Sequence, residues 1–406
     1  MTPEIKHRIE QIKNSEIPKG YKHSKVGIIP EDWEVLRLKD KFDRLSRKNA
    51  EGNTNVLTIS AQYGLINQEE FFKKAVASDD KSNYYLLQRG EFAYNKSYSN
   101  GYPFGAIKRL SRYDKGVVSP LYICFSANAD NACPEYYEQY FEAGKMNHEI
   151  QAFAQEGARN HGLLNISVSD FFNSFILVPP VAEQEKIAKI LSAQDKVIEC
   201  YEKKIEQLKL MKKYYLQNMF PKRGETVPKI RFNGFTDPWE QRKASEITSV
   251  APFKQYLSEA KDDGEYEVIQ QGDKPILGYA NGSPFMEYEK TTLFGDHTLS
   301  LYKTKSPFFV ASDGLKILYS DGMDGYFYYY LLEKYKPESE GYKRHFTILK
   351  GSECSFPKLK DEQEKIGKCF NGLDNLITLH QRKLEEEKKK KKALQQLLLT
   401  GIVRTN

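Results

Sequence analysis

The chain has 406 residues, 40% of them hydrophobic and 13% aromatic, which is enough for two globular cores rather than one. A mean hydropathy of −0.65 and the lack of any run near 18 uncharged apolar residues exclude a membrane-spanning helix; the first residues have no apolar signal core, so we expect a cytoplasmic protein. The net charge of +6 is modest, so any nucleic-acid surface must come from a local concentration of Lys and Arg.

The N-terminal half is predicted to contain a short leader and one sheet-rich domain. Residues 1–28 should form a helix over 4–13 and a linker, because Pro18-Lys19-Gly20 interrupts any helical pattern. Residues 29–180 begin at Pro30-Glu31-Asp32-Trp33-Glu34 and end at Val178-Pro179-Pro180. Between these motifs, short β-like runs at 56–60, 117–118 and 121–125 are separated by Gly and Asn turns. This texture predicts a sheet-rich α/β globule.

Residues 181–220 are predicted to form a long helix. Its seam positions alternate at four- and three-residue spacing, as in a coiled coil. They are Ile187, Leu191, Gln194, Ile198, Tyr201, Ile205, Leu208, Lys212 and Tyr215.

The rest of the chain repeats this plan, with a second domain over 221–357 and a second long helix over 358–406. The motif that contains Trp33, which we call the entry motif, recurs as Phe235-Thr236-Asp237-Pro238-Trp239-Glu240. The exit motif is Val178-Pro179-Pro180 with Glu183-Gln184-Glu185-Lys186-Ile187, and it recurs as Phe356-Pro357 with Glu362-Gln363-Glu364-Lys365-Ile366. Strand-like runs again lie between, at 266–269 and 308–310. Adding 179 (366 minus 187) to the first seam gives Ile366, Phe370, Leu373, Ile377, His380, Leu384, Glu387, Lys391 and Leu394.

The two copies of each motif are more alike in sequence than the two segments that the motifs enclose. From Trp33 to Glu183 is 150 residues (183 minus 33), whereas from Trp239 to Glu362 is 123 (362 minus 239). Duplication followed by simple drift is the alternative, but drift should also blur the motifs. We call the repeated entry and exit motifs the frame, and the segments between them its contents. A repeated frame with different contents is typical of two domains that share a fold and recognise different targets.

Two features of the helices have competing interpretations. The charged run at 385–392 could line a phosphate backbone, but Glu and Lys four residues apart, as in Glu385 and Lys389, also stabilise a solvated helix face, which we favour. His380 lies in the seam, where a histidine is far more often a packing or register residue than a ligand.

Residues able to contact DNA gather in both domains. In the first, cations, amides and aromatics of the types that bind phosphates and base edges are Lys96, Tyr98, Asn100, Tyr102, Lys108, Arg109 and Arg112. In the second they are Gln270, Gln271, Lys303 and Lys305. The competing interpretation is an ordinary polar edge of a Tyr-rich sheet.

A small shared pattern precedes both exit motifs. A glycine is followed by a cation and then by a histidine in both copies, which adds Arg159, Asn160 and His161 in the first domain and Lys343, Arg344 and His345 in the second. Two similarly placed loops suit backbone contacts with DNA, although they could simply be turns.

No motif for catalysis was found. The only Pro-Pro is Val178-Pro179-Pro180-Val181, whose valine cannot accept from an adenine amino group as a methyltransferase Asn or Asp does. No G-x-G and no phosphate-binding G-x-x-x-x-G-K-[ST] occur. The five cysteines and seven histidines show no metal-ligand spacing. We therefore expect a non-catalytic protein that binds no metal.

The duplicated order of Trp33 and Trp239 entry motifs, Glu-Gln-Glu-Lys-Ile exit motifs and long helices, together with residues 157–165, resembles type I restriction-modification specificity subunits over essentially the whole chain. The resemblance implies an α/β (α+β) fold, with two target recognition domains separated by two long antiparallel coiled-coil helices in a pseudo-two-fold repeat. Pro357-Lys358-Leu359 departs from a second Pro-Pro, and Glu387 and Lys391 interrupt the second seam.

The same resemblance implies a function and partners. Such a subunit recognises a bipartite, asymmetric double-stranded DNA target and positions two methyltransferase (M) and two restriction (R) subunits for adenine methylation or cleavage. S-adenosylmethionine, ATP and Mg are then expected on the partners, with no cofactor on this chain. The alternative is a coiled-coil scaffold or adaptor whose two globules bind proteins; a fused DNA-modifying enzyme is disfavoured by the missing motifs.

Overall fold

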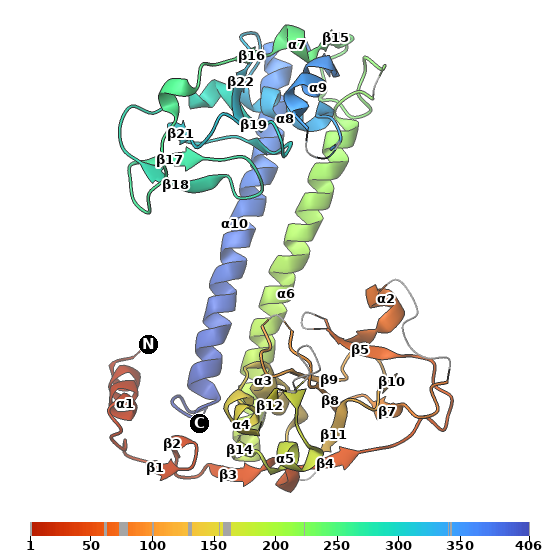
Figure 1. Ribbon diagram of the computed structural model, residues 1–406, viewed down its shortest axis with the longest axis vertical. Helices are drawn as coiled ribbons and strands as arrows, with labels where there is room; N and C mark the ends of the chain where they lie inside the picture. The colour runs from red at the N-terminus through yellow and green to blue at the C-terminus, as the bar shows by residue number, and fades with distance from the viewer. Residues whose placement is uncertain are drawn as a thin grey trace. The chain divides into compact units, whose positions relative to one another are not determined.

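The computed structural model describes residues 2–60, 63–72, 80–99, 101–128, 132–153, 155–156 (backbone only), 164–222, 224–339, 341 and 343–405. It forms two compact units: unit 1 comprises residues 1–199 and 385–406, and unit 2 comprises residues 200–384. Both units contain part of each long helix, α6 (Val181–Asn218) and α10 (Lys360–Leu398) (Figure 1). No helix in the described part of the chain is long and apolar enough to span a membrane.

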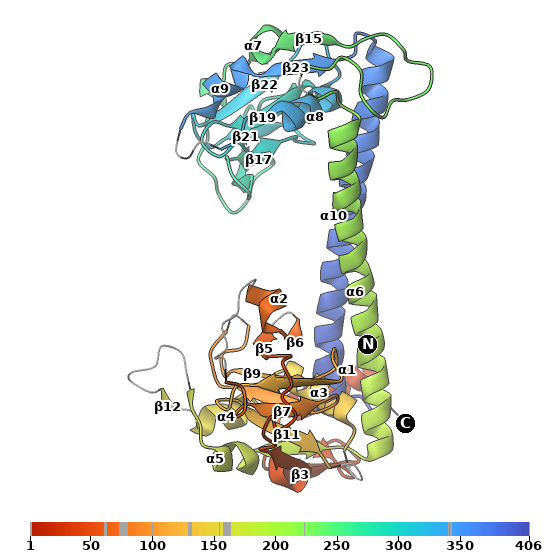
Figure 2. The same ribbon diagram turned by 90° about the vertical axis from the view of Figure 1, so that its right-hand side faces the viewer.

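Unit 1 is built on a four-stranded antiparallel sheet in the order β4 (Phe42–Leu45), β11 (Ile123–Ala127), β8 (Phe92–Asn95), β9 (Ala106–Arg109). Helix α3 (Pro134–Glu142) covers it (Figure 2), because its aromatic face packs on the strand aromatics: Phe42, Phe92, Phe125, Tyr137 and Phe141 are all buried and in ring contact. Strands β3 (Glu34–Arg37) and β14 (Phe175–Val178) pair at the entry and exit of the domain.

The remaining elements of unit 1 lie around this core. Hairpin β5 (Leu57–Ser60) and β6 (Gly64–Asn67) bridges to β10 (Lys115–Val118), which pairs with β7 (Tyr85–Gln88). The others are α1 (Pro3–Lys13), β1 (Tyr21–Ser24), β2 (Gly27–Pro30), η1 (Leu38–Asp40), α2 (Gln68–Phe72), α4 (Asn147–Phe153), β12 (Gln155–Glu156), β13 (Leu164–Asn165) and α5 (Val168–Asn173).

Unit 2 repeats the plan. Its antiparallel sheet has the order β16 (Ser249–Val250), β22 (Leu315–Tyr319), β19 (Thr291–Gly295), β20 (Leu301–Tyr302), and β15 (Glu240–Lys243) pairs with β23 (Glu353–Phe356). Helix α8 (Gly325–Tyr335) takes the place of α3. A second sheet has the order β18 (Ile276–Ala280), β17 (Tyr266–Ile269), β21 (Phe308–Val310); the remaining elements are α7 (Ala244–Ile247), η2 (Lys254–Tyr256), η3 (Tyr288–Lys290) and α9 (His345–Gly351).

The two tryptophans of the entry motifs each bind the first glutamate of an exit motif. In unit 1, buried Trp33 donates its indole N–H to Glu183 at 2.9 Å, and Arg404 donates to both oxygens of the same carboxylate at 2.9 and 2.8 Å. In unit 2, Trp239 donates to Glu362 at 3.3 Å, and Arg231 donates to both oxygens of that carboxylate at 2.7 and 2.9 Å. We call each set of Trp, Glu and Arg a frame node.

The glutamines of the exit motifs complete the frame. Gln184 donates to the carbonyl of Pro179 and accepts from the amide of Cys133, at 2.8 and 2.9 Å. Gln363 likewise donates to the carbonyl of Pro357 and accepts from the amide of Asp324, at 2.8 and 3.1 Å. In each copy one side chain therefore joins the exit strand, the long helix and the segment just before α3 or α8, which explains why the motifs vary less than their contents.

The long helices run antiparallel within each unit. In unit 2, Tyr201 lies against His380 and Lys212 pairs with Asp374, so positions rise along α6 as they fall along α10. Of the predicted seam residues, Ile187, Leu191, Ile205, Leu208, Ile366, Phe370, Leu373 and Ile377 are buried, whereas Ile198 and Leu384 are only partly so.

The N-terminal residues differ from the linker expected after the first helix. Residues 21–30 form the β1–β2 hairpin, and the Tyr21 hydroxyl donates to the carbonyl of Gly401 at 2.7 Å. Arg8 of α1 donates to the carbonyl of Ile402 at 2.6 Å. The two ends of the chain therefore pack on each other within unit 1, a long-range contact that no local pattern predicts.

Candidate nucleic-acid interface

In unit 2, two of the predicted segments meet at the turn that follows β19. The amide of His345 donates to the carbonyl of Asp296 at 2.8 Å, and the next amide donates to the Asp296 carboxylate at 2.9 Å. Gln271 accepts from the amide of His297 at 3.1 Å on the other side of the turn. Exposed Arg344 and partly buried Gln271 thus flank the same turn.

The turn itself is tightly constrained. Leu299 adopts a φ of 57°, which is unfavourable for a branched side chain, and it is buried. A Cβ at Gly295 would lie 2.4 Å from the Thr298 hydroxyl oxygen and 2.5 Å from that of Ser300. Ser300 in turn accepts from the amide of Gly272 at 2.8 Å. The 296–300 turn and the 270–272 segment therefore form one rigid tip, which we call tip 2.

Unit 1 has the same junction. Lys96 is the first residue after β8, as Asp296 is after β19, and its carbonyl accepts from the amide of Leu164 at 3.1 Å. Its ammonium group donates to the carbonyl of Ile166 at 3.4 Å. Tyr98 follows, with 63% of its surface exposed. We call this junction tip 1; the predicted residues Asn100, Arg159, Asn160 and His161 lie outside the described residues.

Three of the predicted residues in unit 1 are instead engaged with α3. Lys108 is buried, pairs with Glu142 and donates to the Tyr102 hydroxyl at 2.8 Å. Burial, reinforced by Glu142, raises the pKa of Tyr102, so its phenol stays protonated. Arg109 pairs with Glu135 and, at 2.8 Å, with Glu138. These charges bind the sheet to its covering helix and are neutralised there.

The other predicted residues of unit 2 are also placed by the structure. Lys303 donates to the carbonyls of Tyr288, Glu289 and Thr291, and burial lowers its pKa to about 8. Gln270 donates to the carbonyl of Lys274 at 2.9 Å, and Lys305 donates to Asn375 on α10 at 2.8 Å.

Exposure separates the candidates further. His345 is fully buried, so we leave its side chain out of the proposed DNA contacts. Arg112, in the turn between β9 and β10, and Lys343 are exposed.

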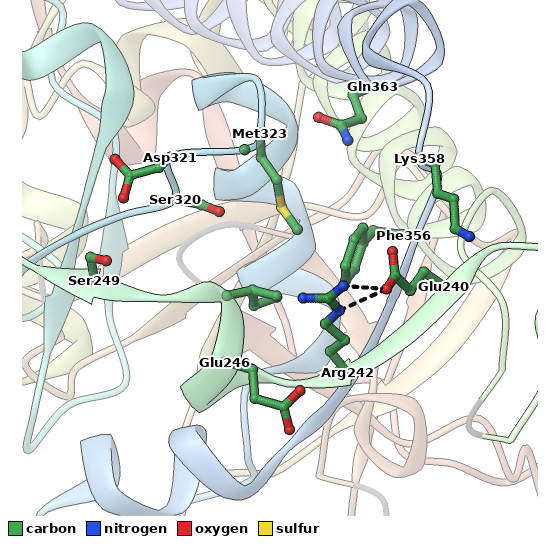
Figure 3. Close-up of a pocket in the computed structure, with 12 residues that line it drawn as sticks. Glu240, Arg242, Glu246, Ser249, Ser320, Asp321, Met323, Phe356, Lys358 and Gln363 are labelled. Carbon is green, nitrogen blue, oxygen red and sulfur yellow. Dashed lines mark hydrogen bonds and ion pairs between the residues drawn. The ribbon is translucent and has the colours of Figure 1, made fainter.

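A surface hollow of about 340 Å³ lies beside the exit motif of unit 2 (Figure 3). Arg242 lies across it and pairs with Glu240, while Glu246, Asp321 and Lys358 also line it. Its charges are of both signs, and none of the predicted DNA contacts lies among its lining residues. It is therefore not part of the candidate interface.

Sequence reasoning missed the arginines of the frame nodes. Arg231 and Arg404 lie outside the repeated motifs, 131 residues before Glu362 and 221 after Glu183 respectively (362 minus 231; 404 minus 183). The only signal was indirect: a buried glutamate in a repeated motif requires a cation, but its position in the sequence was open.

Comparison with known proteins agrees with this architecture. Residues 30–210 match the model of the type I restriction modification DNA specificity domain. The putative type I restriction enzyme MjaX specificity subunit of Methanocaldococcus jannaschii is 24% identical over 95% of this chain and 97% of its own length. The MjaVIII specificity subunit of the same organism is 22% identical over 93% and 94%.

Two solved structures share the fold. The type I restriction-modification S subunit from M. genitalium has a TM-score of 0.60 at 16% identity and covers 90% of this chain and 96% of its own. A chain from a study of complex assembly and conformational transition of the type I R-M system has a TM-score of 0.51 at 15% identity, covering 92% and 99%. Residues 30–210 thus match the specificity-domain model, and the chain as a whole is similar in sequence and in fold to type I restriction-modification specificity subunits.

Proposed function

We propose that this chain recognises a bipartite, asymmetric double-stranded DNA target, one half with each unit. The observation that carries the proposal is the contrast between the frame and the tips. In both units the residue after an equivalent strand accepts a backbone hydrogen bond through its carbonyl, from Leu164 in unit 1 and from His345 in unit 2, but that residue is Lys96 in tip 1 and Asp296 in tip 2. A common docking mode with different side chains suits two different half-sites.

The proposed contacts include exposed candidates and three partly buried candidates at the tips, Lys96, Gln270 and Gln271. In unit 1 they are Lys96, Tyr98 and Arg112, with Asn100, Arg159, Asn160 and His161 retained from the sequence. In unit 2 they are Gln270, Gln271, Lys305, Lys343 and Arg344. Arg and Lys would bind phosphates or guanine edges, and Gln suits adenine. Tyr102, Lys108, Arg109 and Lys303 would act indirectly, by positioning the sheet that carries the tips.

We further propose that the chain is the non-catalytic subunit of a complex with two methyltransferase and two restriction subunits. The sequence has no Asn- or Asp-Pro-Pro-aromatic loop and no phosphate-binding loop, so adenine methylation and ATP-driven cleavage would be carried out by the partners. The matched domain and the relatives are named for specificity, which supports a recognition role for this chain.

Binding of random-sequence duplex by the purified chain, with and without its methyltransferase partner, tests the proposal. At two salt concentrations the complex should bind with an affinity that falls steeply as salt rises, because phosphate contacts release counterions. No binding at either salt would overturn DNA recognition and favour the alternative of an adaptor whose globules bind proteins.

A further inference from the structure

An ion pair links the two long helices at equivalent places in both units. In unit 1, Lys391 of α10 pairs with Asp195 of α6 at 2.6 Å, and 15% of the lysine side chain is exposed. Gln139 of α3 donates to the same carboxylate at 2.7 Å. One carboxylate therefore joins both long helices and the helix that covers the sheet.

Unit 2 contains the same arrangement with the helices exchanged. Lys212 of α6 pairs with Asp374 of α10 at 2.9 Å, with 16% of its side chain exposed. Tyr330 of α8 donates to Asp374 at 2.7 Å. Both residues of each pair are related by the offset of the repeat, since 374 minus 195 and 391 minus 212 are both 179.

The polar seam residue Lys391 is thus paired rather than a defect in the packing. A second polar contact, between Gln194 and Glu387 at 2.6 Å, has no such counterpart. The positions equivalent to it, Leu373 and Leu208, are buried apolar residues of unit 2. Of these two polar contacts, the Asp–Lys pair is the one that both units contain.

We infer that these two Asp–Lys pairs, which we call helix pins, fix the register of α6 against α10 and the place of each globule along them. A seam of apolar residues repeats every seven positions, so a slip of one heptad again brings apolar residues together, and a polar pair is what distinguishes one register from the next. Such a slip moves a helix by roughly 10 Å, or about three base pairs. The helix pins would therefore set the gap between half-sites; this inference rests on the proposed function.

Partial burial makes the helix pins suitable for this role. Exposed ion pairs contribute little, whereas removing one partner of a shielded pair leaves a charge without its counterion. On the same helix, Lys368 and Glu364 form an ion pair with 78% and 48% of their side chains exposed. Substitution of both residues of that pair by alanine is a matched control, because it removes one positive and one negative charge from α10 without affecting the register.

The first test measures the gap directly. The full chain with its methyltransferase partner would be given a DNA library in which the gap between half-sites varies. Wild type and the K368A/E364A control should methylate one gap. D195K, which places two ammonium groups together, should raise methylation at neighbouring gaps by roughly threefold or more relative to the preferred one, and the D195K/K391D exchange should restore the preference. The buried side-chain amide oxygen of Gln139, which has no partner among the described residues, is available to accept from the exchanged ammonium group.

The second test measures register without DNA. Spin-labelled side chains at Lys189 and Lys392, both exposed in unit 1, report the position of α6 against α10. D195K should broaden or shift their distance distribution, and the exchange should restore it. Unchanged distances and an unchanged gap preference in D195K would overturn the helix pins, even if methylation fell uniformly. If the wild-type chain with its partner methylated no gapped target, the proposed function would be refuted. The spin-label distances would still show whether the helix pins fix the register.

Discussion

The frame nodes of the two units have the same contacts but take their arginines from different parts of the chain. Unit 2 uses Arg231, from the segment between α6 and β15, whereas unit 1 uses Arg404, from the C-terminus. In both cases the arginine follows the long helix that ends in that unit. Unit 1 is therefore discontinuous in sequence, and its frame node includes Arg404 from the C-terminal segment.

The contents of the frames differ more than the frames. In unit 1, β10 pairs antiparallel with β7 and forms a parallel bridge to Val56, whereas in unit 2 the corresponding strand, β21, pairs in parallel with β17 and forms bridges to Phe285 and Leu257. The tips also differ in charge, because the residue after the equivalent strand is Lys96 in tip 1 and Asp296 in tip 2. Contacts that hold the helices are shared, and the surfaces proposed to face DNA are not.

The largest expected effect breaks one unit and spares the other. Leu191 and Phe370, which are equivalent by the repeat offset, are both fully buried, each in its own core. Leu191→Ala and Phe370→Ala should each reduce the free energy of unfolding of their own unit by about 3–5 kcal/mol through lost packing and a cavity.

Tryptophan fluorescence during urea unfolding can measure each unit separately, because the chain has two tryptophans, one in each unit. A Trp239→Phe background reports unit 1 and a Trp33→Phe background reports unit 2. Tyr98→Ala, at an exposed position, should change neither by more than about 0.5 kcal/mol. If Leu191→Ala destabilised both units equally, the division into two units would be wrong.

The next effect distinguishes the two frame nodes. Arg404→Ala should destabilise unit 1 by about 2 kcal/mol, because it leaves the Glu183 carboxylate buried without its cation; this allows for the arginine's own partial exposure. Arg231→Ala should act in the same way on unit 2. The same fluorescence backgrounds provide the measurement, and an effect of Arg404→Ala on unit 2 rather than unit 1 would contradict the assignment of the C-terminus.

A smaller effect is the acid sensitivity of unit 1. Burial raises the pKa of Glu183, but hydrogen bonds from Arg404 and Trp33 outweigh it, so the pKa is lowered overall from 4.5. A lowered folded-state pKa means that the stabilisation is present above about pH 4.5 and is lost as the pH falls through the folded value. Unit 1 of the wild type should therefore weaken more steeply below pH 4.5 than unit 1 of Glu183→Gln. Parallel profiles would exclude Glu183 as the group responsible.

The smallest effect on stability concerns the proposed DNA contacts. Arg112→Ala should leave unfolding within about 0.5 kcal/mol of wild type and reduce the slope of log affinity against log salt by about 0.9, the loss of one phosphate contact. Lys108→Met should lower the free energy of unfolding and leave the salt slope unchanged, because Lys108 is buried against Glu142. An unchanged slope in Arg112→Ala would remove this residue from the interface.

The sequence predicted the features that repeat. Strands at 266–269 and 308–310 are β17 and β21, and the alternating seam located α6 and α10. What it could not predict depends on side chains far apart in sequence. Lys108 and Arg109 had the composition of a DNA contact, but the carboxylates of α3 that neutralise them come 26 or more residues later (135 minus 109) and are brought near only by the sheet.

The helices show the same limit. Lys391 looked like an interruption of the seam because its partner, Asp195, is on the other helix 196 residues away (391 minus 195). Once the antiparallel pairing is known, the repeat offset makes Lys212 and Asp374 its counterpart. Pairing across a duplication is therefore visible in sequence only when the orientation of the helices is assumed first.

The central claim is that two units with one frame recognise two different half-sites. Mapping adenine methylation in DNA from cells that carry this chain with its methyltransferase partner tests it most directly. The account predicts one two-part motif with a fixed gap and different sequences in its halves. An uninterrupted motif, identical halves, or a gap that varies freely would contradict it.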